Sequence, residues 1–173
     1  MDIRLAGMGD LPAVLEFYEE LIDAQTGAKD SPRWTKGVYP SEEDLRKHIA
    51  GERMFLGFRE GELSAAMALT RNDLEGYDAV PWRVEAAPEE VFFLHLLAVH
   101  PRHARRGLGR EMVSFAMEQA RSRGAKALRL DVIRENRPAV ELYTSMGFQT
   151  AGESRLYYED IGWADFWLME YTL

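Results

Sequence analysis

The sequence feature that most constrains the fold is an apolar run at residues 91–99, VFFLHLLAV. Its length suits one strand, Pro101 follows it, and a strand that is apolar at almost every position lies inside a sheet with both faces covered. Other parts of the chain must therefore cover each face of that sheet. The run predicts a mixed α/β protein, with His95 as the one ionisable side chain in its central strand.

Periodicity, caps and turns predict further elements on both sides of this run. Upstream, they indicate a short strand, two helices and a hairpin, at residues 3–5, 11–22, 42–49 and 54–70. Downstream, they indicate a helix, a strand, a second helix and two C-terminal strands, at residues 107–124, 128–132, 136–147 and 148–173. Three helices have predicted N-caps: Asp10, Ser41 and Asn136. The length suits one domain, so we expect residues 1–173 to form a single domain.

Composition excludes several classes of function. The 21 Lys and Arg against 29 Asp and Glu give a net charge of −8, which argues against generic binding to nucleic acid. The chain has no cysteine, which excludes disulfides, thiolate zinc sites and a cysteinyl intermediate. No apolar run approaches the ~18 residues of a membrane span, and we see no signal peptide. We therefore expect a cytoplasmic protein without membrane or nucleic-acid partners.

A basic, glycine-containing segment follows the apolar run, at residues 102–110, RHARRGLGR. It precedes a predicted helix, and backbone N–H groups at a helix N-terminus favour phosphate. The segment fits neither common nucleotide motif, because Met112 stands where a dinucleotide-binding fingerprint needs glycine and no Gly-Lys-Ser/Thr occurs. It predicts a pyrophosphate cradle, and a solvated basic turn is the alternative. Its arginines repel cations, so His100 and His103 are not expected to bind a metal.

Several motifs occur in an order that resembles a known family. LAVHP ends the apolar run, ARRGLG precedes the next helix, LDV lies in the following strand, and NRPAVELYTSMGF covers the last helix. This region, residues 96–152, is similar to the acetyl-coenzyme A core of the Gcn5-related N-acetyltransferase (GNAT) superfamily. The resemblance implies a mixed, mostly antiparallel central sheet of six to seven strands flanked by about four helices, with the cofactor core at about residues 91–152.

The resemblance also implies how acetyl-CoA, the co-substrate, would be bound. Backbone groups of Leu97 and Val99 would meet its pantetheine arm, and Asn136 and Ala139 would line the other wall of its channel. The pyrophosphate would be held by the amides of six consecutive residues: Arg105, Arg106, Gly107, Leu108, Gly109 and Arg110. The family's loop pattern usually opens with Gln or Arg, whereas this sequence has Ala104 at that position.

Two residues are candidates for catalysis. Tyr143 matches the family tyrosine whose hydroxyl lies near the thioester sulfur, and its place on an apolar helical stripe also suits a core aromatic residue. His95 is similar to the histidine of arylalkylamine-type members that helps to deprotonate the amine, and a satisfied core histidine is the alternative. The implied activity is transfer of acetyl from acetyl-CoA to a primary amine of a small molecule or peptide, by direct attack in a ternary complex.

The acceptor is expected to meet two long loops outside the cofactor core. Their aromatic residues, with nearby acidic side chains, would form a wall for a cationic amine: Trp34, Tyr39, Tyr77 and Trp82. Packing within the loops is the alternative. The rival function is a non-catalytic acyl-CoA-binding module that senses or stabilises a partner, and Tyr143 favours the enzyme. Exposed C-terminal strands would be compatible with a homodimer.

Overall fold

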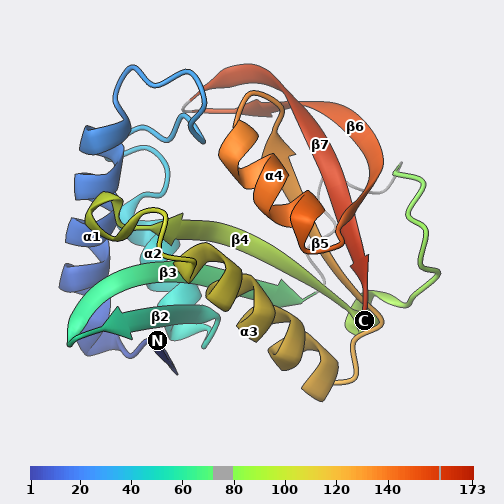
Figure 1. The fold of residues 1–173 in the computed structure, drawn as a ribbon, viewed down its shortest axis with the longest axis horizontal. Helices are drawn as coiled ribbons and strands as arrows, with labels where there is room; N and C mark the ends of the chain where they lie inside the picture. The colour runs from blue at the N-terminus through green and yellow to red at the C-terminus, as the bar shows by residue number, and fades with distance from the viewer. Residues whose placement is uncertain (72–79, 160) are drawn as a thin grey trace.

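The computed structural model describes residues 1–71, 80–159 and 161–173, in which one seven-stranded sheet organises the chain (Figure 1). Its spatial order is β1-β2-β3-β4-β5-β7-β6, and every neighbouring pair is antiparallel except β4 and β5. This is the mixed, mostly antiparallel sheet that the family resemblance implies. The strands are β1 (Asp2–Leu5), β2 (Met54–Arg59), β3 (Glu62–Arg71), β4 (Val91–Val99), β5 (Ala127–Ile133), β6 (Gln149–Tyr158) and β7 (Gly162–Thr172).

Helices cover both faces of the sheet (Figure 1). One face is covered by α1 (Leu11–Gln25) and α2 (Glu42–Ala50), and the other by α3 (Leu108–Ser122) and α4 (Arg137–Ser145). Three short 3-10 turns complete the elements: η1 (Met8–Asp10), η2 (Pro88–Glu90) and η3 (Pro101–His103). Across the described residues, the helices are too short or too polar to cross a membrane.

Two of the three predicted helix N-caps are confirmed. Ser41 Oγ accepts the Asp44 N–H at 3.1 Å, and the Asp44 carboxylate accepts the Ser41 N–H at 3.0 Å, which forms a capping box. Asn136 Oδ1 accepts an N–H from the first turn of α4 at 3.4 Å. Asp10 occupies the N-cap position of α1 without capping it, because the Arg4 guanidinium binds its carboxylate at 2.7 and 2.8 Å and lowers the pKa of Asp10 to about 2.

The central strand β4 contains a bulge. Ala68 of β3 lies opposite His95 and Ala66 lies opposite Ala98, so β4 has one more residue than β3 between these pairs. Leu96 takes up the extra residue with a φ of 54°, a left-handed conformation that residues with a Cβ rarely adopt. The regular alternation of side chains between the two faces of the sheet is therefore interrupted at Leu96.

Strands β4 and β5 are paired only at their N-terminal ends. Residues 91–93 pair with residues 127–129, whereas β4 continues to Val99 and β5 to Ile133 without further mutual pairing. The two strands therefore diverge towards their C-terminal ends.

A buried ion pair holds the chain segment before β4 against the sheet. Arg129 and Glu170 are 4% and 2% exposed, and Arg129 Nε donates to Glu170 Oε2 at 2.8 Å. The other Glu170 oxygen accepts the backbone N–H groups of Arg83 and Val84 at 2.9 and 3.0 Å. The Arg129 guanidinium also lies 4.4 Å from the centroid of the Trp82 ring. One charged pair thereby fixes the path of this segment.

The C-terminal strands form a hairpin at one edge of the sheet, where β6 is the last strand in the spatial order. Tyr157 and Trp163 are 62% and 63% exposed on this hairpin, with ring centroids 5.6 Å apart. The C-terminal strands are thus exposed in part, and the homodimer stays a prediction.

Candidate active site

A cavity of about 340 Å³ lies where β4 and β5 diverge, and its size suits a small-molecule site. Its lining comes from the end of α1 and the segment after it, from β4, from the start of α3, and from β5, α4 and β7. The cavity brings together nine of the residues predicted from the sequence: Trp34, Tyr39, His95, Leu97, Val99, Gly109, Asn136, Ala139 and Tyr143.

One end of the cavity lies at the N-terminus of α3. Gly109 lines it, and a Cβ added there would lie 3.2 Å from Leu142 Cδ2 and 3.8 Å from Val99 Cγ2. Gly107, at the N-cap of α3, has a φ of 80°, which suits glycine. A side chain at position 109 would fill the space between α3 and the facing wall, so glycine keeps the backbone accessible from the cavity.

The other residues of the predicted phosphate cradle do not line the cavity itself. Arg105 and Arg106 are exposed, whereas Leu108 is 1% exposed and packs in the core. Arg110 donates a hydrogen bond to a serine hydroxyl of α4 at 2.7 Å. These residues directly precede α3 or form its first turn beside Gly109. Because N–H groups at a helix start have no partner inside the helix, their backbone N–H groups can bind an anion.

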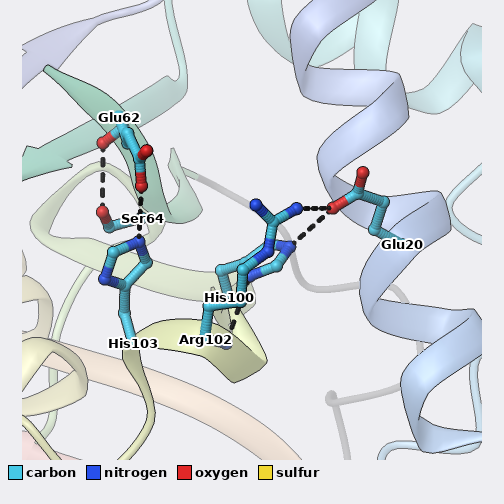
Figure 2. Close-up of polar contacts among 6 residues, drawn as sticks. All are labelled: Glu20, Glu62, Ser64, His100, Arg102 and His103. Carbon is cyan, nitrogen blue, oxygen red and sulfur yellow. Dashed lines mark hydrogen bonds and ion pairs between the residues drawn. The ribbon is translucent and has the colours of Figure 1, made fainter.

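Two carboxylates anchor η3, the turn that leads into this segment (Figure 2). Glu20 of α1 contacts both His100 Nε2, at 2.9 Å, and the Arg102 guanidinium, at 2.7 Å, which lowers the pKa of Glu20. His103 Nε2 lies 3.4 Å from the Glu62 carboxylate of β3. The two histidines thus face different carboxylates, and the start of the basic segment is held between α1 and β3.

Helix α1 holds the bulge in β4 in place through one buried hydrogen bond. Tyr18, 1% exposed, donates a hydrogen bond from its hydroxyl to the Leu96 carbonyl oxygen at 2.6 Å. Burial raises the pKa of Tyr18 well above its ordinary value, so the hydroxyl remains a donor at neutral pH. The bond orients the backbone between Leu96 and Leu97, both of which line the cavity.

Tyr143 and Asp131 form part of the wall that α4 and β5 contribute. Tyr143 is 7% exposed, and its ring centroid lies 5.5 Å from that of Phe148. Burial, and secondly the Asp131 carboxylate, raise the pKa of Tyr143 above its ordinary value of 10, so the phenol is protonated at neutral pH. Asp131 was not predicted as a site residue, because it fits the polar positions of an alternating strand. The signal that could have identified it is an acidic side chain near the end of β5 that diverges from β4.

His95 lines the same cavity from β4. It is half-buried, and its imidazole stacks on Phe93 with ring centroids 6.2 Å apart and ring planes inclined by 15°. The stacking suits a core histidine, and the place in the lining suits a group that reaches a bound molecule. The structure therefore contains a feature of each alternative.

The opposite end of the cavity is lined by the segment after α1. Trp34 and Tyr39 have ring centroids 6.5 Å apart and both contribute to this lining. Gln25 and Asp30 line the same end. Sequence reasoning missed these two polar residues because no motif or periodic pattern includes them.

Trp82, predicted to contact the acceptor, does not contribute to the cavity lining. Its indole packs on Phe93, with ring centroids 6.4 Å apart, in a separate apolar cluster beside the buried Arg129. The Arg129–Glu170 ion pair holds its segment against the sheet, which is why the indole packs there. Tyr77 lies outside the described residues.

The chain matches the model of the acetyltransferase (GNAT) family over residues 15–148. Because this match covers most of its length, the chain belongs to that family. The family, the fold class and the enzyme class expected from the sequence are thereby confirmed.

Curated relatives include enzymes with named acceptors. The chain is 33% identical to ribosomal protein bS18-alanine N-acetyltransferase of Salmonella typhimurium over 107 residues, which are 62% of this chain and 69% of the relative. It is 37% identical to streptothricin acetyltransferase of Streptomyces lavendulae over 86 residues, 49% of this chain and 44% of the relative. A match to an uncharacterized protein of Mycobacterium leprae, 34% identical over 102 residues, covers 59% of this chain and 27% of that relative's length.

Solved structures share the whole fold. A GNAT-family acetyltransferase from Streptococcus agalactiae has a TM-score of 0.83 and 20% identity, and the match covers 99% of this chain and 95% of that one. The Salmonella typhimurium protein yncA, solved with its cofactor acetyl-CoA, has a TM-score of 0.72 and 20% identity over 100% of this chain and 94% of that one. At these identities, the likeness establishes the fold.

Proposed function

We propose that this protein transfers the acetyl group of acetyl-CoA to a primary amine of a small molecule or peptide, by direct attack in a ternary complex. The cavity between β4 and β5 carries the proposal, because Gly109, His95 and Tyr143 line it in a member of an acetyltransferase family. The names of the two enzyme relatives support an amine acceptor, and the acetyl-CoA bound to yncA supports the donor. A non-catalytic acyl-CoA-binding module is not favoured.

The residues at the α3 end of the cavity would hold the donor. Acetyl-CoA supplies a thioester whose carbonyl carbon accepts the amine. Backbone N–H groups of residues 105–110 bind its pyrophosphate, because N–H groups at a helix start have no partner inside the helix. Backbone groups of Leu97 and Val99 bind the pantetheine arm from one wall, and Asn136 and Ala139 line the other.

His95 accepts the proton that the acceptor must lose. An alkylamine has a pKa near ~10 and is mostly protonated at neutral pH, so a base must remove a proton before the amine can attack, and the His95 imidazole does so directly or through water. The amine nitrogen then bonds to the thioester carbonyl carbon, and a backbone N–H near Leu97 stabilises the oxyanion. The chain has no cysteine, which excludes a cysteinyl intermediate and favours direct transfer.

Tyr143 donates to the departing sulfur as the C–S bond breaks. Its raised pKa keeps the hydroxyl protonated, as a donor must be. A thiol has a pKa near ~8.5, below that of a phenol, so the hydroxyl acts first as a hydrogen-bond donor to the thiolate. The proton that the attacking nitrogen still carries passes through this hydroxyl or through water to sulfur, so the products are the amide and the CoA thiol.

Acetyl-CoA is expected to raise the Tm of the protein by roughly 5–10 °C, and Gly109→Glu is expected to remove that rise. Binding to the native state alone contributes about 2.7 kcal/mol at a 100-fold excess over Kd. A glutamate at position 109 would crowd Leu142 and place a negative charge beside the phosphate site. Thermal unfolding with acetyl-CoA, CoA, NAD and ATP measures the effect, and circular dichroism checks the fold of the variant. A Tm unmoved by saturating acetyl-CoA, or moved equally by NAD, contradicts the proposal.

Tyr18→Phe is expected to lower kcat about tenfold or more while the Kd for acetyl-CoA changes little. The variant keeps the ring contacts with Phe17 and Trp34 but leaves the buried Leu96 carbonyl without its donor. Stability then falls by about 1–3 kcal/mol, and a displaced oxyanion donor slows chemistry by up to ~10²-fold. Steady-state kinetics and calorimetry measure the two quantities. An unchanged kcat would show that the bulge keeps its shape without this bond.

A further inference from the structure

The cavity lining contains two carboxylates and, among the described residues, neither lysine nor arginine. Within the described part of the chain, the ionisable residues of its lining are Asp30, Tyr39, His95, Asp131 and Tyr143. Aspartate side chains are ionised at neutral pH, whereas tyrosine is neutral there. The two carboxylates come from different walls, one from the segment after α1 and one from β5. A molecule between these walls is therefore exposed to negative charge from both.

The residues that the structure does not describe contain no lysine or arginine. The residues outside the described part, 72–79 and 160, read NDLEGYDA and D and contain neither lysine nor arginine. They do contain further acidic residues. These positions therefore cannot contribute a lysine or an arginine to the cavity.

Arginines that neighbour the lining in sequence are directed elsewhere. Arg33 of the segment after α1 lies 3.6 Å from the Glu135 carboxylate, and Arg134 lies 3.5 Å from the Glu153 carboxylate. Arg137 is exposed at the start of α4, beside the residues assigned to the donor. None of these three guanidinium groups contributes to the cavity wall.

Aromatic rings line the end of the cavity formed by the segment after α1, where the acceptor is expected to bind. Trp34 and Tyr39 line it together, and the Trp34 ring lies 5.7 Å from that of Tyr18. The face of an aromatic ring attracts a cation through its quadrupole, and most strongly when the ring is tryptophan. Carboxylates and aromatic faces therefore favour the same kind of ligand, an organic cation.

We infer that the acceptor is a cationic amine with no carboxylate or other anionic group beside its amino group, an inference that rests on the proposed function. In an α-amino acid, a carboxylate is attached to the carbon that bears the ammonium group. In this cavity that carboxylate would meet Asp30 and Asp131 without a lysine or arginine to balance it, which penalises the amino acid relative to the plain amine. A diamine, an arylalkylamine and a peptide N-terminus all satisfy the requirement.

Matched pairs of acceptors test this inference: tyramine against tyrosine, tryptamine against tryptophan, and phenethylamine against phenylalanine. An amine without an α-carboxylate is the stronger base and has less neutral amine at a given pH. A preference for the plain amine thus cannot arise from its ionisation. A short peptide with a free N-terminus and an amidated C-terminus distinguishes peptide from small-molecule acceptors.

The readout is kcat/KM from release of CoA thiol, for the wild type, for Asp30→Asn and for the control Glu16→Gln. Glu16 is exposed on α1 and does not contribute to the cavity lining.

We expect kcat/KM for each plain amine to exceed that for its amino acid at least tenfold. Asp30→Asn should narrow this ratio at least threefold, and Glu16→Gln should leave it unchanged. Equal or better use of the amino acids, or a ratio unaffected by Asp30→Asn, would overturn the inference. Acetyl-CoA binding is measured on the same preparations, because no binding, or binding without acetylation of any amine, would instead overturn the proposed function.

Discussion

Replacing Tyr143 with phenylalanine is expected to lower kcat by ~10²–10⁴-fold while the Kd for acetyl-CoA stays within about twofold. The ring that packs on Phe148 remains, and only the hydroxyl that would donate to the departing sulfur is lost. Because the pKa of Tyr143 is raised, its hydroxyl stays protonated through neutral pH, and any loss of activity from its ionisation should begin only above pH 10. Steady-state kinetics and calorimetry separate the two effects. Full turnover in this variant would remove the donor role.

His95→Gln is the companion variant, because it keeps a polar side chain but cannot take up a proton near neutral pH. If His95 is the base, its protonation stops it from accepting the proton of the amine, which produces an acidic limb in the rate profile. That limb should disappear in His95→Gln and persist in Tyr143→Phe. A limb of wild-type shape in His95→Gln would return His95 to the role of a core histidine stacked on Phe93.

Replacing Glu170 with glutamine is expected to lower the free energy of unfolding by about 3–5 kcal/mol, a fall in Tm of roughly 6–20 °C. The change leaves the buried Arg129 guanidinium without the charge that balances it. Thermal and denaturant unfolding followed by circular dichroism measure the loss.

An exposed ion pair provides the matched control. Arg46 lies 2.6 Å from the Glu42 carboxylate with both side chains more than half exposed, so Glu42→Gln should cost less than about 1 kcal/mol. A double variant, Arg129→Met with Glu170→Leu, should recover part of the loss, because it removes the unpaired buried charge. A Glu170→Gln variant as stable as Glu42→Gln would show that the buried pair contributes little.

The local elements were predictable from the sequence because short-range physics decides them. The apolar run at residues 91–99 coincides with β4, and the Ser41 capping box begins α2. The glycine-containing turn at residues 60–61 joins β2 to β3 as a hairpin. In each case, the signal lies within a few residues of the feature that it predicts.

The shape of the site depends on contacts that no local pattern encodes. The bulge at Leu96 arises from the register between β3 and β4, and its hydrogen bond comes from Tyr18, 78 residues away in the chain. Trp82 was misassigned because its position depends on the buried pair between Arg129 and Glu170, 41 residues apart. Partners this distant are brought together only by the folded sheet.

The most direct test of acetyl transfer is to incubate the protein with acetyl-CoA and a pooled panel of amines. Free thiol and acetylated products are then measured together, the products by mass spectrometry. The account predicts one free CoA thiol for each acetylated amine, and loss of both signals in Gly109→Glu. Binding of acetyl-CoA without an acetylated product from any amine would contradict it and place the chain among non-catalytic acyl-CoA-binding modules.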